Sequence, residues 1–333
     1  MSGAAFLFAL GDVRRVVCHR NSEATACPDG TAAAILLADA LPDVEVMFAA
    51  YGAELDTIEP GPGLLFADIC PRTRIDEHVA ARAIVLDHHA SHKDVVRRFG
   101  NRGIFGSKTE SGASLVFDHV WATIANRKQR QSSERDAAET FARLAAVRDT
   151  WQRDHAAWTA ASEQAAALTL FSWDDWRVIR RPFYSGGGAP TFTSMLSSGR
   201  PLYAARLRRA QLAASGATYL WTTAGTRLAI VNTLDTSDLA EIVDADVLVG
   251  FSISNERPCT AEPRSGEERG ASLDDARIRY SFRARGDYDV GSLAKSAGGG
   301  GHRGAAGCVV PLTYKMDAIT QAFLFVENHE AST

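Results

Sequence analysis

The sequence predicts an α/β protein with two lobes: an N-terminal domain built on a parallel β-sheet and a smaller α/β domain at the C-terminal end. In the first half of the chain, short apolar runs alternate with segments of helical periodicity, which is typical of a parallel sheet covered by helices. The alternation restarts near residue 217, after a helix-like segment. We therefore predict a domain at 1–198, a connecting helix at 199–216 and a second domain at 217–333.

The N-terminal domain is predicted from apolar runs and amphipathic segments taken in chain order. The pattern predicts strands at 14–19, 44–52, 63–70 and 82–89, and helices at 30–41, 111–126 and 132–151. A glycine-rich stretch at 184–190 predicts a flexible loop. Because the strands alternate with helices, we expect a largely parallel sheet covered on both faces.

The C-terminal domain shows shorter elements. The pattern predicts strands at 217–223, 227–233, 245–253 and 278–285, and a helix at 237–244. The segment 255–277 is polar and rich in turn formers, which predicts a surface hairpin or loop. The tail from Met316 predicts a closing helix.

Composition excludes several classes of protein. The chain has 333 residues, 46% of them hydrophobic, and a net charge of −4, so no global basic field recruits long nucleic acid. The five cysteines are scattered without a CxxC pair, which argues against a disulfide framework. No apolar run approaches the roughly 20 residues that span a bilayer. We expect a cytoplasmic protein without a membrane partner.

Titratable side chains gather where predicted strands end. The apolar run at 83–86 leads directly into Asp87, His88 and His89. Ligands of parallel α/β sheets bind beyond the carboxyl ends of the strands. Other acidic or imidazole side chains occupy a strand end, the start of the first helix or the end of a later helix: His19, Asp68, Asp29 and Asp149.

Such a density of carboxylates requires compensating cations. Mixed aspartate and histidine ligands suit Mn²⁺ and related divalent ions, including Mg²⁺ and Co²⁺, better than a structural zinc site. Two ions about 3.5–4 Å apart that share one carboxylate would stabilise both oxygens of a phosphoryl transfer. The alternative is that each aspartate is only a helix cap or a surface residue.

A second motif lies in the C-terminal domain. Residues 298–307, GGGGHRGAAG, contain four consecutive glycines followed by His302 and Arg303. Successive unobstructed backbone N–H groups can form a concavity that binds anions. The alternative is a flexible linker.

Together these stretches resemble a known family. LDHHAS, LFADIC, CPDG and GGGGHRGAAG are similar to motifs of the DHH phosphoesterase superfamily with its DHH-associated C-terminal domain. Its members include the single-strand exonuclease RecJ, nano-RNases, cyclic-dinucleotide phosphodiesterases and exopolyphosphatase relatives. The resemblance covers about residues 14–315. It implies a DHH catalytic domain followed by a substrate-binding domain.

The resemblance also implies roles for individual residues. Asp68 would bridge two metal ions, and His19 would hold the first. Asp87 would orient a histidine, and His89 would face the scissile phosphate. The second ion would be completed by Asp29, His88 and Asp149, and the substrate would be gripped by Arg283, Gly299, Gly300, Gly301 and His302.

The first motif departs from the family pattern. The family has a histidine and then two aspartates separated by one residue, whereas here only Asp29 is present, ten residues after His19. If Asp29 is the second aspartate, Cys27 stands in place of the first. If Asp29 is the first, Thr31 stands in place of the second.

We therefore expect a metal-dependent phosphodiesterase that hydrolyses short oligonucleotides or cyclic or linear dinucleotides by a two-metal mechanism. The alternatives are a phosphoanhydride hydrolase acting on polyphosphate or pyrophosphate, and a non-catalytic nucleotide-binding protein. The active site is expected in a cleft between 87–89 and 298–302. The expected partner is a short oligonucleotide or dinucleotide, and a homodimer is compatible with the sequence.

Overall fold

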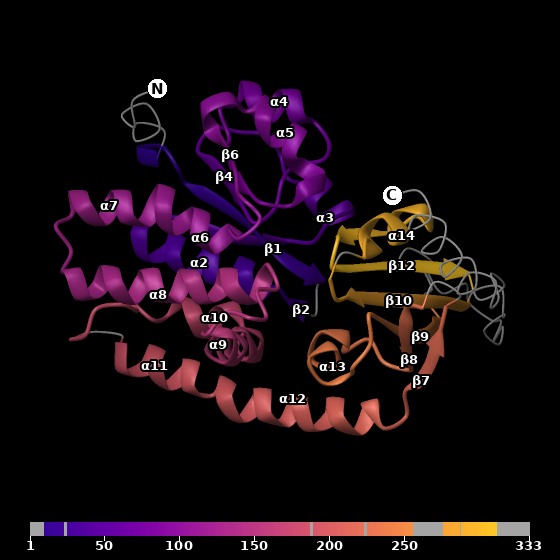
Figure 1. Ribbon diagram of the computed structural model, residues 1–333. Helices are drawn as coiled ribbons and strands as arrows, with labels where there is room; N and C mark the ends of the chain where they lie inside the picture. Colours follow the sequence, from indigo (N-terminus) through magenta and orange to yellow (C-terminus); the bar gives the residue numbers. More distant parts are fainter. Residues whose placement is uncertain are drawn as a thin grey trace, which may run out of the picture. The chain divides into compact units, whose positions relative to one another are not determined.

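The computed structural model of the protein describes residues 10–22, 25–186, 189–222, 225–255, 276–286 and 288–311. The chain divides into two compact units, Met1–Tyr203 and Ala204–Thr333, coloured along the sequence in Figure 1. The division falls inside helix α12 (Gly199–Ala214), where a connecting helix is expected. Most of the predicted loop at 255–277 and the predicted closing helix lie outside the described residues.

The first unit is built on a parallel sheet with the strand order β3-β1-β4-β5-β6. A two-residue strand, β2, pairs antiparallel with the end of β1. The strands predicted from sequence are present, and the short β2 and β6 are additions. Their bounds are β1 Arg15–Ser22, β2 Thr25–Ala26, β3 Glu45–Ala49, β4 Leu64–Ala67, β5 Ile84–Asp87 and β6 Gly103–Phe105.

Both faces of this sheet are covered, as the sequence predicts. In β1, Val16 and Cys18 belong to one hydrophobic core and Val17 to another. Strand β5 repeats the alternation, with Leu86 in the first core and Val85 in the second. This is the period of two expected for an extended chain. Figure 1 shows α4 and α5 on one face and α2, α6 and α8 on the other.

The helices of the first unit follow the strands in chain order. The second core is covered by α3 (Ala53–Asp56), α4 (Ile75–Ala80) and α5 (Lys93–Arg98). Helix α6 (Gly112–Val116) continues through the π-helical η3 (Phe117–Trp121) into α7 (Ala122–Arg127), so the single helix predicted at 111–126 contains a wide turn. The other helices are α2 Pro28–Ala40, α8 Ser132–Asp149, α9 Trp158–Leu170, α10 Trp173–Arg177 and α11 Ala189–Ser197.

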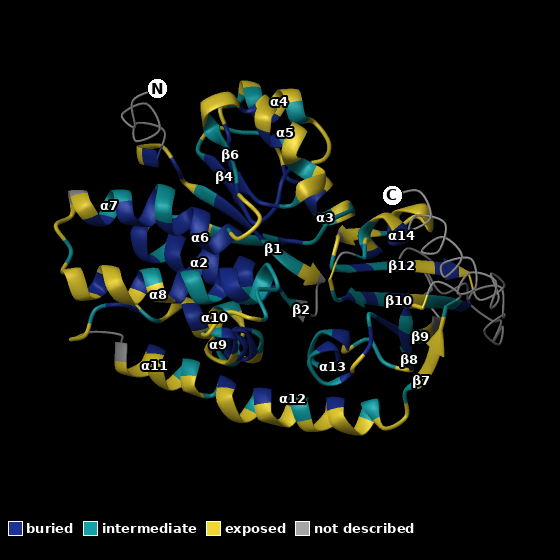
Figure 2. Cartoon of the chain, viewed as in Figure 1, coloured by how far each residue is buried: buried dark blue, intermediate teal, exposed yellow. Residues whose placement is uncertain are grey.

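Helix α2 is the central helix of the unit and is almost completely buried (Figure 2). It contacts β1, α6, α8 and α9. Its small side chains permit this close approach on all sides. At Gly30, a Cβ would lie 2.1 Å from the carbonyl oxygen of His19, so only glycine fits where α2 begins against β1. This contact fixes the start of α2 beside the end of β1.

The second unit contains one mainly antiparallel sheet with the order β11-β12-β10-β9-β8-β7, in which only β8 and β9 run parallel. The glycine-rich segment forms β11 and its turn into β12. The elements are β7 Thr218–Trp221, β8 Arg227–Val231, α13 Thr236–Ile242, β9 Val247–Asn255, β10 Ala276–Ala284, α14 Val290–Ser296, β11 Gly300–His302 and β12 Ala305–Pro311. Within the described part of the chain, no helix has the length and apolarity needed to cross a membrane.

Candidate metal centre

The predicted metal ligands of the first unit come together at the carboxyl edge of its sheet. His19 lies in β1, Asp68 follows β4 directly, and His88 follows β5. Asp29 is in the first turn of α2, and Asp149 is the last residue of α8. The parallel sheet brings the three strand ends together. Helices α2 and α8 add their carboxylates from the face of the sheet that carries the first hydrophobic core.

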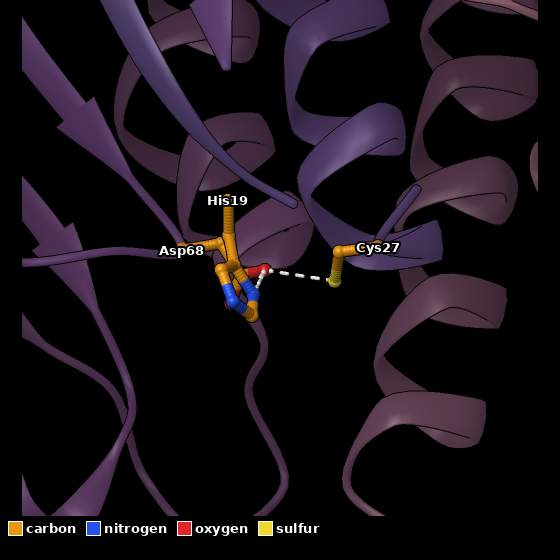
Figure 3. Close-up of side chains that lie close together, drawn as sticks. All are labelled: His19, Cys27 and Asp68. Atoms are coloured by element: carbon orange, nitrogen blue, oxygen red, sulfur yellow. Dashed lines mark hydrogen bonds and ion pairs between the residues drawn. The ribbon is translucent and has the colours of Figure 1, made fainter. Parts of the chain in front are cut away.

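Asp68 is the centre of this cluster. Its Oδ2 lies 3.5 Å from Nδ1 of His19 and accepts a hydrogen bond from Sγ of Cys27 at 3.4 Å (Figure 3). Its Oδ1 lies 3.2 Å from Nε2 of His88. The side chain is only 1% exposed, and the residue has φ = 62°, in the left-handed region that a non-glycine residue seldom adopts. Strained backbone of this type is typical of functional sites.

The other carboxylates face the same histidine. Nε2 of His88 lies 3.1 Å from Oδ2 of Asp149. Asp29 is held from the opposite side, because its Oδ1 accepts hydrogen bonds from Oγ of Ser111 at 2.6 Å and from the N–H of Ala113 at 3.2 Å. Ser111 caps α6. The start of that helix therefore fixes the orientation of the Asp29 carboxylate.

Asp87 is fully buried and contacts histidines instead of the other carboxylates. Its Oδ1 accepts from the backbone N–H of His88 at 2.8 Å and lies 2.7 Å from Nδ1 of His89. Its Oδ2 lies 2.7 Å from Nδ1 of His92. The ring of His92 also contacts the hydroxyl of Tyr51, at 3.4 Å. Asp87 thus orients two imidazoles, as a positioning residue would.

Burial and like charges shift the acid–base properties of the cluster. Burial, together with the charges of Asp68 and Asp149, raises the pKa of Asp29 well above its ordinary value. For Asp68, burial is outweighed by hydrogen bonds from His19 and His88, which hold its pKa well below the usual range. For His88, burial lowers the pKa, but Asp149 and Asp68 outweigh it and raise the pKa to about 12. In the metal-free protein, a protonated His88 therefore supplies the positive charge between two carboxylates.

The donors fit divalent metal ions. Among the described residues, four groups of three side chains each offer ligand atoms that lie within 4.8 Å of one another. Two of the groups, His19–Cys27–Asp68 and Asp68–His88–His89, share Asp68. Nδ1 of His19 is buried, and its contact with Oδ2 of Asp68 is long, at 3.5 Å. The groups are His19–Cys27–Asp68, Asp68–His88–His89, Asp87–His89–His92 and Asp29–His88–Asp149.

Sequence reasoning missed the roles of two residues that shape this centre, His92 and Ser111. His92 lies five residues after Asp87, yet it shares the Asp87 carboxylate with His89. Ser111 was expected only near a helix start, but its hydroxyl also holds Asp29. The small sequence separation between Asp87 and His92 was the signal that could have identified His92. Nothing in the sequence links Ser111 to Asp29, which is 82 residues away.

The residues predicted to grip the substrate lie in the second unit. Arg283 is in β10, and its Nη2 donates to Oγ of Ser237 at 2.8 Å. The N–H of Gly299 donates to the carbonyl of Ala294 at 2.8 Å, so this amide is used by the end of α14. Gly300, Gly301 and His302 form β11.

At two of these glycines, close packing leaves no room for a side chain. A Cβ on Gly299 would lie 2.1 Å from the carbonyl oxygen of Gly307. Gly301 has φ = 141°, and a Cβ there would lie 2.5 Å from the carbonyl oxygen of Ala305. Gly300 has open space around it. The glycine run is therefore partly explained by the tight β11–β12 hairpin, and its role in anion binding stays a prediction.

Part of the second unit matches a known family model. Residues 264–325 match the family model of the DHHA1 domain. The described part of this match contains β10, α14, β11 and β12. No curated protein matches the sequence.

Solved structures show the same fold over nearly the whole chain. The DHH domain of a member of the s1p family of ribosomal proteins has a TM-score of 0.53 and 10% identity, and the match covers 96% of this chain and 89% of that one. Exonuclease RecJ bound to manganese has a TM-score of 0.50 and 13% identity, with 98% and 93% covered.

RecJ from Thermus thermophilus in complex with Mn²⁺ has a TM-score of 0.50 and 14% identity. This match covers 98% of the present chain and 54% of that RecJ, so the two share the fold over about half of the longer protein. Residues 264–325 therefore match a DHHA1 domain, and nearly the whole chain has the fold of RecJ and of the DHH domain of the s1p-family protein.

Proposed function

We propose that the chain is a divalent-metal-dependent phosphodiesterase that hydrolyses short oligonucleotides or linear or cyclic dinucleotides. The observation that carries this proposal is the position of Asp68. One of its carboxylate oxygens faces His19, and the other faces His88. A single buried carboxylate that faces two donor groups is the arrangement required to bridge two metal ions.

The residues can be assigned to two adjacent metal sites. His19 and Asp68 would hold one ion, and Asp29, His88 and Asp149 would hold the other together with Asp68. Mn²⁺ is the expected ion, and Mg²⁺ or Co²⁺ would also fit these donors. RecJ structures of the same fold hold Mn²⁺ or Mg²⁺. When bound, the ions supply activation of water and neutralisation of the phosphate charge.

The chain's own groups prepare this chemistry. Ser111 and the N–H of Ala113 keep Asp29 aimed at the cluster. Asp87 orients His89, whose side chain is 20% exposed and can therefore meet a substrate phosphate. Because Oδ1 of the buried Asp87 contacts both the backbone N–H and Nδ1 of His89, His89 is held in one orientation before substrate arrives.

The second unit is proposed to bind the substrate. The guanidinium of Arg283 and the side chain of His302 would donate charge-assisted hydrogen bonds to phosphate groups. The net charge of −4 favours short substrates, since long nucleic acids require extended basic surfaces.

The two roles can be separated by mutation. Because His302 is proposed to bind phosphate, His302→Ala should raise KM and leave metal content unchanged. Because His88 is proposed to bind metal, His88→Ala should lose metal.

The decisive experiment compares substrates at fixed Mn²⁺. The wild-type protein should hydrolyse a 5′-phosphorylated dinucleotide or a cyclic dinucleotide, and a chelator should stop the reaction. Asp68→Asn should lower turnover by about 100-fold or more, because it removes the shared negative ligand. Asp118→Asn is the matched control, since Asp118 pairs with Arg143 and lies in η3.

The other outcomes separate the alternatives. Hydrolysis of polyphosphate without hydrolysis of any phosphodiester would favour a phosphoanhydride hydrolase. A protein that binds metal and dinucleotide but turns over neither a dinucleotide nor a p-nitrophenyl phosphodiester would be a non-catalytic binding protein.

A further inference from the structure

The side chains of His19, Cys27 and Asp68 converge on one point (Figure 3). Sγ of Cys27 lies 3.4 Å from Oδ2 of Asp68, and Nδ1 of His19 lies 3.5 Å from the same oxygen. A tetrahedral ion with bonds of about 2.0 Å to oxygen or nitrogen and about 2.3 Å to sulfur requires separations of about 3.3–3.5 Å. Both separations from Oδ2 of Asp68 match those of ligands on one small ion, and all three donor atoms lie within 4.8 Å of one another.

The surroundings of Cys27 hold its sulfur in this position. The residue is the N-cap of α2, and its Sγ accepts the N–H of Gly30 at 3.5 Å. Cys27 is 5% exposed. The backbone thus orients the sulfur toward Asp68. Burial and the charges of Asp68 and Asp149 raise the pKa of the Cys27 thiol well above its ordinary value, so the sulfur needs a bound cation to ionise.

Helix capping alone does not account for a cysteine at this position. Serine, threonine, aspartate and asparagine are the preferred N-cap residues. A serine would cap α2 and hydrogen-bond to Asp68 equally well. Nδ1 of His19 would still be a buried nitrogen that meets the Asp68 carboxylate only at the long distance of 3.5 Å. An ion at the convergence point would satisfy both this nitrogen and the sulfur.

We propose that Cys27 is a metal ligand, and that with His19 and Asp68 it forms a site that prefers Zn²⁺ or Co²⁺ to Mn²⁺ or Mg²⁺. Thiolate ligands select Zn²⁺ and similar ions, whereas carboxylates suit Mn²⁺ and Mg²⁺. On binding, the Cys27 thiol loses its proton to solvent, and the sulfur-to-Asp68 hydrogen bond is replaced by two bonds to the ion. The neighbouring Asp29–His88–Asp149 site has no sulfur donor, so the two sites would hold different metals. This assignment depends on the proposed function in one respect: the centre must bind two metal ions.

A Co²⁺ titration of the purified full-length protein tests the assignment. A cobalt–thiolate bond gives a charge-transfer absorption in the near ultraviolet that oxygen and nitrogen ligands do not give. The wild-type protein should show this band, and Cys27→Ser should lose it while still capping α2. Cys308→Ser is the matched control, because Cys308 is a buried cysteine in β12. It should keep the band.

Metal competition gives a second readout that does not depend on activity. Cys27→Asp restores a carboxylate and should shift the preference for Zn²⁺ over Mn²⁺ by about tenfold or more toward Mn²⁺, measured by elemental analysis after equilibration with both ions. Wild-type protein that binds two ions without a charge-transfer band, or Cys27→Asp with unchanged preference, overturns the role of Cys27 alone. Wild-type protein that binds no divalent ion overturns the two-metal proposal as well.

Discussion

Gly112 and Asp68 pack so closely that a Cβ on Gly112 would lie 2.3 Å from the Cβ of Asp68. The same atom would lie 2.9 Å from Oδ2 of Asp29. Gly112 is the first residue of α6, so this helix presses against the metal ligands with no side chain between. The residue therefore controls the position of two carboxylates without itself offering a ligand.

Gly112→Ala should accordingly displace Asp68 and Asp29 and weaken metal binding. We expect Mn²⁺ affinity to fall by about 10- to 100-fold, the range seen when groups that orient ligands are lost. Isothermal titration calorimetry measures it. Gly11→Ala is the control, because a Cβ there meets nothing within 4 Å. Unchanged Mn²⁺ affinity in Gly112→Ala would show that the backbone of α6 can shift without displacing Asp68 and Asp29.

Metal binding should release protons. Burial lowers the pKa of His88, but Asp149 and Asp68 outweigh it and raise the pKa to about 12, so the metal-free protein carries a protonated His88 at pH 7. A metal ion requires neutral imidazole, so His88 must lose its proton on binding. Mn²⁺ affinity should therefore rise with pH, by about tenfold per unit for one proton released.

Calorimetry between pH 6.5 and 8, in two buffers of different ionisation enthalpy, counts the protons. The sign follows from competition: protons and Mn²⁺ occupy the same nitrogen, so acid opposes the metal. Affinity that stays flat over this range, with no dependence on the buffer, would mean that His88 is already neutral or is not a ligand.

Much of the centre could be predicted because a parallel sheet brings its strand ends together. His19, Asp68 and His88 each end a predicted strand, and the structure places them around one point. Periodicity and topology alone were sufficient for this. The family resemblance assigned Asp149 to the second ion, because a residue at a helix end has no strand to locate it.

The remainder depends on contacts that no local pattern encodes. Helix starts bring Ser111 and Gly112 to the cluster through the packing of α6 on α2 and β4. The sequence left open whether Cys27 or Thr31 replaces the missing aspartate, and the structure places Cys27 against Asp68. Short elements such as β6 and α10 escaped prediction because a few residues carry no periodicity.

His92 should act as a positioning residue for Asp87. Asp87 is 0% exposed, and its Oδ2 lies 2.7 Å from Nδ1 of His92. His92→Ala leaves this oxygen of a buried carboxylate without that donor, which should cost about 1–3 kcal/mol of unfolding free energy. Since Asp87 also holds His89, we expect kcat to fall more than KM rises.

The conservative variant separates positioning from bulk packing. The side-chain amide of His92→Asn can place an N–H near the position of Nδ1, so it should restore most of the stability and kcat that His92→Ala loses. Urea unfolding and steady-state kinetics of the three proteins provide the measurement. Equal losses in both variants would argue for a role of the ring itself, through its contact with Tyr51.

His78 should make the first unit sensitive to acid. It lies in α4, is 2% exposed, and packs edge-on against Phe66 at a ring distance of 5.2 Å. Burial, with a smaller contribution from Arg74, lowers the pKa of His78 from its ordinary value. Its Nδ1 has no hydrogen-bond partner in the described part of the chain. The folded protein therefore favours the neutral ring.

The sign of the pH effect follows from the lowered pKa. Above the unfolded-state pKa, about 6.5, the ring is neutral in both states and His78 adds no pH dependence. As the pH falls below that value, the unfolded chain takes up a proton that the folded chain resists, so stability declines until the folded pKa is passed.

His78→Leu should remove this part of the decline and leave stability at pH 7.5 unchanged or higher, because a buried unsatisfied nitrogen is lost. The exposed His155→Leu is the control. Urea unfolding of wild type and both variants at pH 7.5, 6.5 and 5.5, in the presence of a chelator, measures the difference, and a constant gap between wild type and His78→Leu at all three pH values would refute the assignment.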